Sequence, residues 1–281
     1  MSYKSIVVHL DTSARAQARL QIALHLAKQA NAFLRGVFSI FSPDLRAFVV
    51  MAGSAEYYAD HEKVRLEERG ALERLFHAEL ARAGVEGEWV DADGEASEAV
   101  AFVARSADLV VIGQDDPNDP EAYVCDHFPE NVVMLAGGPV LIVPYAGTFN
   151  AIGKRILVAW DQSREATRAV HDALPFLKQA EHVTILTASA HHSDTANPNG
   201  RSQAAELTGT LARHGVRADK RHVAIPSDVP IGDVLLAQAS EIGADLVVMG
   251  GYGHTRWHEL ILGGATRTIL HSATVPVLMS H

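Results

Sequence analysis

The sequence predicts an α/β protein made of two tandem copies of one domain, each with a parallel sheet covered by helices on both sides. Three observations lead to this fold class. Short apolar runs alternate along the chain with helical patterns, and the runs lack the apolar–polar alternation of half-exposed strands. Segments of one half also recur, in the same order, in the other half.

The internal repeat rests on three pairs of segments. These are residues 4–11 and 154–161 (KSIVVHLD and KRILVAWD), 107–113 and 244–250 (ADLVVIG and ADLVVMG), and 139–143 and 276–280 (PVLIV and PVLMS). Single matches between apolar strands are common, whereas an ordered triple indicates duplication. We therefore predict one domain over 1–147 and a second over 152–281, with a turn-rich seam near 145–150.

The elements of the second copy follow from its periodicity. The predicted strands are 155–160, 182–188, 217–224, 245–250 and 276–280, and the predicted helices are 164–179, 201–214, 231–242 and 263–272. Ser163 has the N-cap residue type, Pro230 precedes one helix and Gly215 follows another. The first copy follows the same plan, with a long charged helix over about 57–83.

Composition limits the partners and the compartment. The 281 residues carry a formal net charge of −10, which argues against binding a nucleic-acid backbone or an anionic membrane surface. No apolar run approaches the ~20 residues of a membrane span. The start of the chain is too short and polar for a signal peptide, and Cys125 is the single cysteine. We expect a soluble cytoplasmic protein.

A glycine-rich segment in the second copy carries the strongest functional signal. Gly250 ends a buried strand, Gly253 lies in the loop beyond it, and Gly263 and Gly264 open the following helix. Glycine lets the backbone approach a ligand closely, and a helix N-terminus offers free N–H groups to an anion. The segment therefore predicts a phosphate cradle. The alternative is that Gly263 and Gly264 only permit close packing of helix on sheet.

The position of the segment supports this interpretation. Ligands of open α/β sheets bind beyond the carboxyl ends of the strands, where the strand order reverses. Asp161 follows the first strand of the second copy, and Gly250 ends its fourth strand. If these strands are neighbours, one crevice contains both, and the Asp161 carboxylate can accept hydrogen bonds from ribose hydroxyls.

These residues resemble the universal stress protein family, whose nucleotide-binding members carry G-x2-G-x9-G-[S/T] after the fourth strand. Gly250, Gly253 and Gly263 match this spacing, and Asp161 matches the aspartate that ends the family's first strand. The resemblance covers essentially the whole chain. It implies Rossmann-like domains, related to adenine nucleotide α hydrolases, with five strands in the order 3-2-1-4-5. It also implies pairing through the last strand, either between the two copies as a pseudo-dimer or between chains as a homodimer.

The resemblance also implies a ligand and the residues around it. The ligand is an adenine nucleotide, ATP with or without Mg²⁺, with ADP and AMP as alternatives, and neither a catalytic residue nor a protein-held metal is implied. The base and ribose would lie near Ala159, Asp161, Thr187, Ala188 and Met249, and the phosphates near Gly250, Gly253, Gly263, Gly264 and Ala265.

One position departs from the family pattern. Gly264 stands where the family has serine or threonine, so a hydroxyl that would donate to phosphate is missing. Losing a hydrogen bond to a charged group, worth ~1.5–3 kcal/mol, weakens binding on the order of ten- to a hundredfold. His254, Arg256 and His258 are the candidate replacement donors.

The first copy lacks the cradle. After Gly113 the chain continues with Gln114, Asp115 and Asp116, and two further carboxylates follow by residue 121. Each like charge at about 4 Å costs a triphosphate ~1–4 kcal/mol. Asp11 is retained, but we predict that this copy does not bind ATP and serves as the structural partner of the second.

Three functions compete at this point. The first is a stress protein whose nucleotide biases a conformation or a partner interaction, with slow ATP hydrolysis at most. The second is a nucleotide-independent scaffold, in which Gly264 marks a degenerate site. The third is an adenylating or hydrolysing enzyme. It ranks last because related ATP-pyrophosphatases carry an S-G-G-x-D-S loop after the first strand, where this sequence has residues 161–164 (DQSR).

Overall fold

The fold is described from a computed structural model of the chain. It describes residues 2–39, 55–92, 94–118, 127–149, 151–190, 198–226, 228–252 and 264–281. Of the residues discussed above, Cys125, Gly253, His254, Arg256, His258 and Gly263 lie outside these ranges.

The chain divides into two compact units. The first unit is Tyr3–Ala136, and the second is Gly137–His281 together with the first two residues. The elements of the first unit are β1 (Ser5–Leu10), α1 (Ala16–Ala30), β2 (Phe33–Phe38), α3 (Ala55–Ala83), β3 (Gly87–Asp91), α4 (Ala96–Ala104), β4 (Leu109–Gly113) and α5 (Phe128–Leu135).

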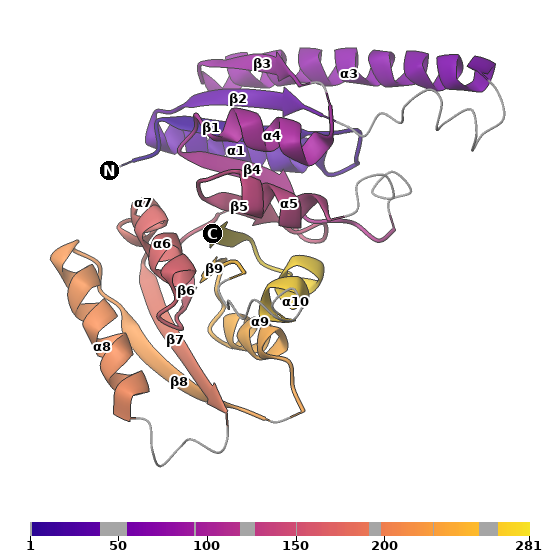
Figure 1. Cartoon of the computed structure of the whole chain (residues 1–281). Coiled ribbons are helices and arrows are strands. Elements are labelled where there is room, and N and C mark those ends of the chain that lie inside the picture. The colour runs from indigo at the N-terminus through magenta and orange to yellow at the C-terminus, as the bar shows by residue number, and fades with distance from the viewer. Residues whose placement is uncertain are drawn as a thin grey trace. The chain divides into compact units, whose positions relative to one another are not determined.

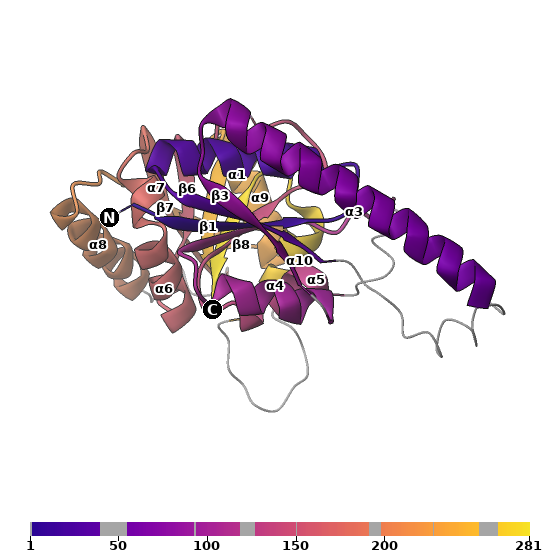
Figure 2. The same cartoon turned by 90° about the horizontal axis from the view of Figure 1, so that it is seen from above.

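The strands of the first unit are parallel and stand in the order β3-β2-β1-β4. Helices α1 and α3 cover one face of this sheet, and α4 and α5 cover the other (Figure 2). Residues Ile6–Val8 of β1 and Leu109–Ile112 of β4 are at most 2% exposed. Both faces are therefore packed, as continuous apolar strands predict.

The second unit contains the complete second repeat and the last strand of the first. Its strands stand in the order β5-β10-β9-β6-β7-β8, and β5 alone runs antiparallel to its neighbour, β10. The elements are β5 (Val140–Val143), β6 (Arg155–Ala159), α6 (Arg164–Asp172), α7 (Leu174–Leu177), β7 (His182–Ala190), α8 (Pro198–Arg213), β8 (Asp219–Ile225), α9 (Ile231–Glu241), β9 (Leu246–Gly250), α10 (Gly264–Ser272) and β10 (Val277–Ser280).

The predicted topology of the second repeat is confirmed. Numbered within the repeat, its five parallel strands stand in the order 3-2-1-4-5. Helices α6 and α8 cover one face, and α9 and α10 cover the other (Figure 1). The strand order of the sheet reverses between β6 and β9. The carboxyl ends of these two strands therefore border the crevice in which ligands of such sheets bind.

One predicted helix was wrong in its extent. The expected helix over 164–179 is two helices, α6 and α7, which meet at Ala173. Pro175 lies in the first turn of α7, and proline has no N–H to donate to the carbonyl four residues earlier. The break follows from that missing hydrogen bond.

The search for membrane spans returned nothing. Within the described ranges, no helix combines the length and the apolar character needed to cross a bilayer.

Candidate functional site

The candidate site lies at the carboxyl ends of β6 and β9 in the second unit. These strands are parallel neighbours, with Ile156 opposite Leu246 and Val158 opposite Val248. Asp161 therefore follows β6 at the same edge of the sheet at which Gly250 ends β9. A crevice shared by Asp161 and Gly250 requires these two strands to be neighbours, and they are.

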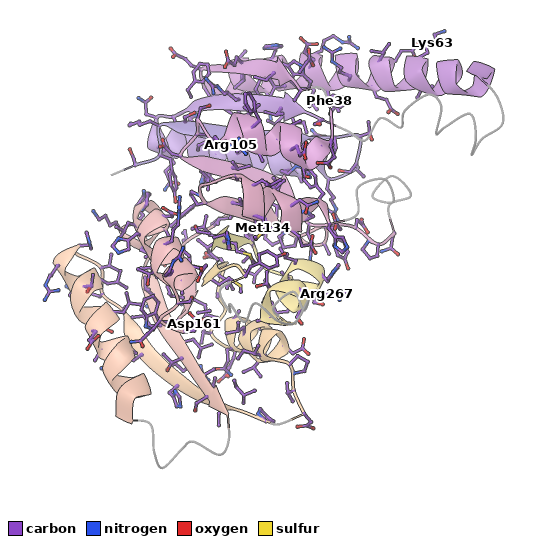
Figure 3. All side chains as sticks on the ribbon, in the orientation of Figure 1. Phe38, Lys63, Arg105, Met134, Asp161 and Arg267 are labelled. Atoms are coloured by element: carbon purple, nitrogen blue, oxygen red, sulfur yellow. The ribbon has the colours of Figure 1, made fainter. Side chains whose placement is uncertain are left out.

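Asp161 is held in a turn that leads into α6. Its Oδ1 accepts hydrogen bonds from the Ser163 backbone N–H at 2.9 Å and from the Ser163 hydroxyl at 2.6 Å. Gln162 between them has a φ of 65°, and Ser163 caps α6 by accepting from the Ala166 N–H at 3.1 Å. The carboxylate is exposed and lies at the turn between β6 and α6 (Figure 3). The turn thus fixes its direction.

The predicted base-contacting residues divide between the two faces of the sheet. Ala159 is opposite Leu186 in the register, and side chains two residues apart on a strand share a face, so Ala159 and Ala188 lie on one face. Thr187 lies on the other face, where its hydroxyl is 2.9 Å from Nδ1 of His222. The structure therefore brings Ala159 and Ala188 together and separates Thr187 from them.

Gly250 has a packing reason to be glycine. A Cβ at this position would lie 2.5 Å from the backbone N of Ala166 and 2.6 Å from the carbonyl carbon of Glu165. The first turn of α6 therefore packs directly on the end of β9. Met249, the preceding residue, is 5% exposed and belongs to the core.

The two ends of the glycine loop are tied to each other. Tyr252 is the last described residue before the loop. Its backbone N–H donates to Oγ1 of Thr266, in the first turn of α10, at 3.3 Å. The Gly251 N–H donates to the Ser280 carbonyl at 2.9 Å. Tyr252 and the first turn of α10 therefore lie next to each other.

The start of α10 is open and suited to an anion. Among the described residues, none lies within 4 Å of a Cβ built on Gly264, and Gly264 itself is exposed. The first turn of α10 contains no acidic residue, while Arg267 is exposed on it (Figure 3). Free N–H groups, the positive end of the helix dipole and one cation thus share this helix end. Ala265 is half-buried beside Gly264.

The equivalent turn of the first unit has the same carboxylate hydrogen bonds, but its backbone differs, since Gln162 has a positive φ and Thr12 does not, and its surroundings differ as well. Oδ1 of Asp11 accepts from the Ser13 N–H at 3.1 Å and from its hydroxyl at 2.5 Å, as in the Asp161 turn. Here Arg19 of α1 also contacts the carboxylate, with Nη2 2.9 Å from Oδ1. After Gly113, Asp116 accepts from the Asn118 N–H, so this loop begins with an acidic turn.

Sequence reasoning missed four residues near these sites: Thr266, Arg267, His222 and Arg19. Arg19 left a detectable signal, because it lies three residues from Ala16 and four from Ala23, on the buried face of α1. His222 and Thr266 left none, because their contacts depend on strand register and on loop closure.

Comparison with known proteins supports the fold. The universal stress protein family model matches residues 2–144 and again 153–281. A universal stress protein from Archaeoglobus fulgidus DSM 4304 is 19% identical, with a TM-score of 0.72 over 98% of this chain and 97% of that one. A putative universal stress protein from Pseudomonas aeruginosa UCBPP-PA14 is 16% identical, with a TM-score of 0.64 over 99% and 93%. Among curated proteins no match was found. The chain belongs to the universal stress protein family, with the family's domain present twice.

Proposed function

We propose that the second unit binds an adenine nucleotide, ATP foremost, and that the protein acts in the stress response through a nucleotide-dependent conformation or partner interaction. Asp161 would accept hydrogen bonds from the ribose, Ala159 and Ala188 would border the base, and the glycine loop with the start of α10 would hold the phosphates. The proposal assigns no residue to bond breaking.

One observation carries the proposal. The exposed carboxylate of Asp161 follows the end of β6, and the start of α10 contacts Tyr252, which follows the end of β9. These two strands are neighbours at the point where the strand order of the parallel sheet reverses. The carboxylate suits a sugar diol and the helix end suits phosphate. The tie between Tyr252 and Thr266 supports it further, because it brings both ends of the glycine loop to that helix end.

The phosphate role of α10 can be tested at Gly264 without disturbing the fold. Within the part of the chain that the structure describes, no atom lies within 4 Å of a Cβ on Gly264, so Gly264→Asp meets no described neighbour. A carboxylate at a helix N-terminus stabilises the helix, but it repels phosphate. We expect calorimetric titration with Mg–ATP to give binding for the wild type and at least tenfold weaker binding for Gly264→Asp.

Gly209→Asp is the matched control. Gly209 lies in α8, is equally open and also lacks a positive φ, so this variant adds the same charge away from the site. Equal affinity in all three proteins would place the nucleotide elsewhere. The absence of heat at millimolar Mg–ATP, with partner interactions kept in Gly264→Asp, would instead favour the scaffold function.

A further inference from the structure

A buried arginine stands at the carboxyl edge of the first unit. Arg19 is 3% exposed, although arginine is almost never fully buried unless it is paired. Its Nη2 lies 2.9 Å from Oδ1 of Asp11, and its Nε donates to the His9 backbone carbonyl at 2.6 Å. The guanidinium therefore bridges the end of β1 and the turn that follows it.

This guanidinium packs against Gly113, at the end of β4. A Cβ on Gly113 would lie 2.2 Å from Nη1 of Arg19, so the arginine packs directly on the glycine backbone. β1 and β4 are parallel neighbours, with Val8 opposite Val111. Arg19 thus fills the space between the strand ends at which an open sheet of this kind binds its ligand.

The second unit uses the corresponding positions differently. Arg19 lies eight residues after Asp11, and Ala169, fully buried, lies eight residues after Asp161. There the glycine that ends β9, Gly250, contacts the backbone of α6 instead of a side chain. One repeat therefore inserts a cation between helix and sheet, while the other lets the helix touch the sheet.

We infer that Arg19 takes the place of a bound ligand in the first unit, closing the crevice between β1 and β4 and permanently occupying Asp11. Asp11 and Asp161 each accept hydrogen bonds from the N–H and the hydroxyl of the serine two residues later, and Asp11 in addition pairs with Arg19. The first unit is then a closed copy, stabilised by an internal ion pair and insensitive to nucleotide.

The charge state of Asp11 agrees with this arrangement. Burial, the largest cause, would by itself raise the pKa of the carboxyl, but the Arg19 charge, the nearby His9 and the hydrogen bonds from Ser13 and Arg19 together outweigh burial, so the pKa falls to about 2. Asp11 is ionised at neutral pH and needs a cation. Removing either partner leaves a buried charge without compensation, whereas removing both leaves none.

The test is a double-mutant cycle in the full chain, read by hydrogen exchange of the β1 and β4 amides. We expect Asp11→Asn and Arg19→Met each to speed this exchange by about a hundredfold or more, as breaking a buried pair does. The acceleration of exchange in the double variant should be far smaller than the product of the two single-variant accelerations. Arg213→Met, which removes an exposed arginine of α8, is the control and should leave these amides unchanged.

Two results would overturn the inference. One is independence, in which the single effects simply multiply in the double variant. The other is a photoreactive ATP analogue that labels first-unit peptides of the wild type and no longer does so in Asp11→Asn. If Arg19→Met does not fold, Arg19→Gln replaces it in the cycle, because glutamine removes the charge but keeps an N–H donor, and the same criterion applies. None of these outcomes depends on nucleotide binding by the second unit.

Discussion

At the residue scale, Gly264 marks the largest departure of the site from the family pattern. Packing against the described residues does not force the departure, since none of them lies within 4 Å of a Cβ at this position. Its consequence is therefore chemical: α10 starts without a hydroxyl that could donate to phosphate. Restoring the hydroxyl isolates this one contribution.

We predict that Gly264→Ser binds ATP about ten- to a hundredfold more tightly than the wild type, because a hydrogen bond to a charged group contributes ~1.5–3 kcal/mol. Calorimetric titration measures the change, with Gly209→Ser as the control at an open position of α8. An unchanged dissociation constant for Gly264→Ser would mean that phosphate does not reach the start of α10.

His9 makes the first unit sensitive to acid. His9 is 4% exposed, its Nε2 lies 2.7 Å from the Ser39 carbonyl oxygen, and its ring centroid lies 4.5 Å from that of Phe128, with the two ring planes tilted by 36°. Burial, the dominant cause, and the nearby Arg19 charge lower the pKa of His9 from 6.5 to about 4, although Asp11 opposes this. The unfolded chain therefore takes up a proton between pH 6.5 and pH 4 that the folded chain refuses.

We predict that this titration lowers the free energy of unfolding by up to roughly 3 kcal/mol as the pH falls from 6.5 to 4. His9→Gln keeps a donor toward the Ser39 carbonyl but cannot take up the proton, so its stability should be flatter over this window. Denaturant titrations at pH 7, 5.5 and 4 give the comparison, with exposed His25→Gln as the control. Parallel stability curves for wild type and His9→Gln would refute the prediction.

At the element scale, the sequence predicted most of the second repeat and failed at one place with a clear cause. Apolar runs located strands such as β6 and β9 to within one residue, because strands buried on both faces cannot be anything but apolar. The Ser163 cap is also confirmed. The division at Pro175 was missed because a strong apolar periodicity continued through it.

The candidate site was predictable only in part, for physical reasons. Asp161 and Gly250 could be placed at one edge because the repeat fixed their strands as first and fourth. The contact of Thr187 with His222 depends on the register of β7 against β8, which no local pattern contains. Likewise, the packing of Gly250 on α6 depends on the closeness of two elements far apart in sequence.

We predict that Gly250→Ala and Gly264→Ala separate packing from binding. Alanine at 250 meets backbone atoms of Ala166 and Glu165 that cannot move independently of α6, and overpacking of this kind costs ~1–3 kcal/mol. Alanine at 264 meets nothing and favours the helix, so stability should hold or rise slightly. Denaturant unfolding measures both variants, and equal stability would contradict the packing role assigned to Gly250.

At the scale of the whole molecule, the two units differ around their equivalent aspartates. The second keeps an exposed aspartate after β6, and the start of α10 contacts Tyr252, which follows β9. The first keeps the aspartate but surrounds it with Arg19 and buries the ion pair. In the second unit, β10 is paired with β9 on one side and with β5 on the other, so this last strand has no free edge for another chain.

The division of labour between the two repeats is tested most directly by counting nucleotides. Native mass spectrometry of the full chain at saturating Mg–ATP should show one nucleotide per chain, retained in Asp11→Asn and lost or strongly weakened in Asp161→Asn, since the two changes are chemically identical and fall in equivalent turns. Two nucleotides per chain, or one that disappears with Asp11→Asn and persists with Asp161→Asn, would contradict the account.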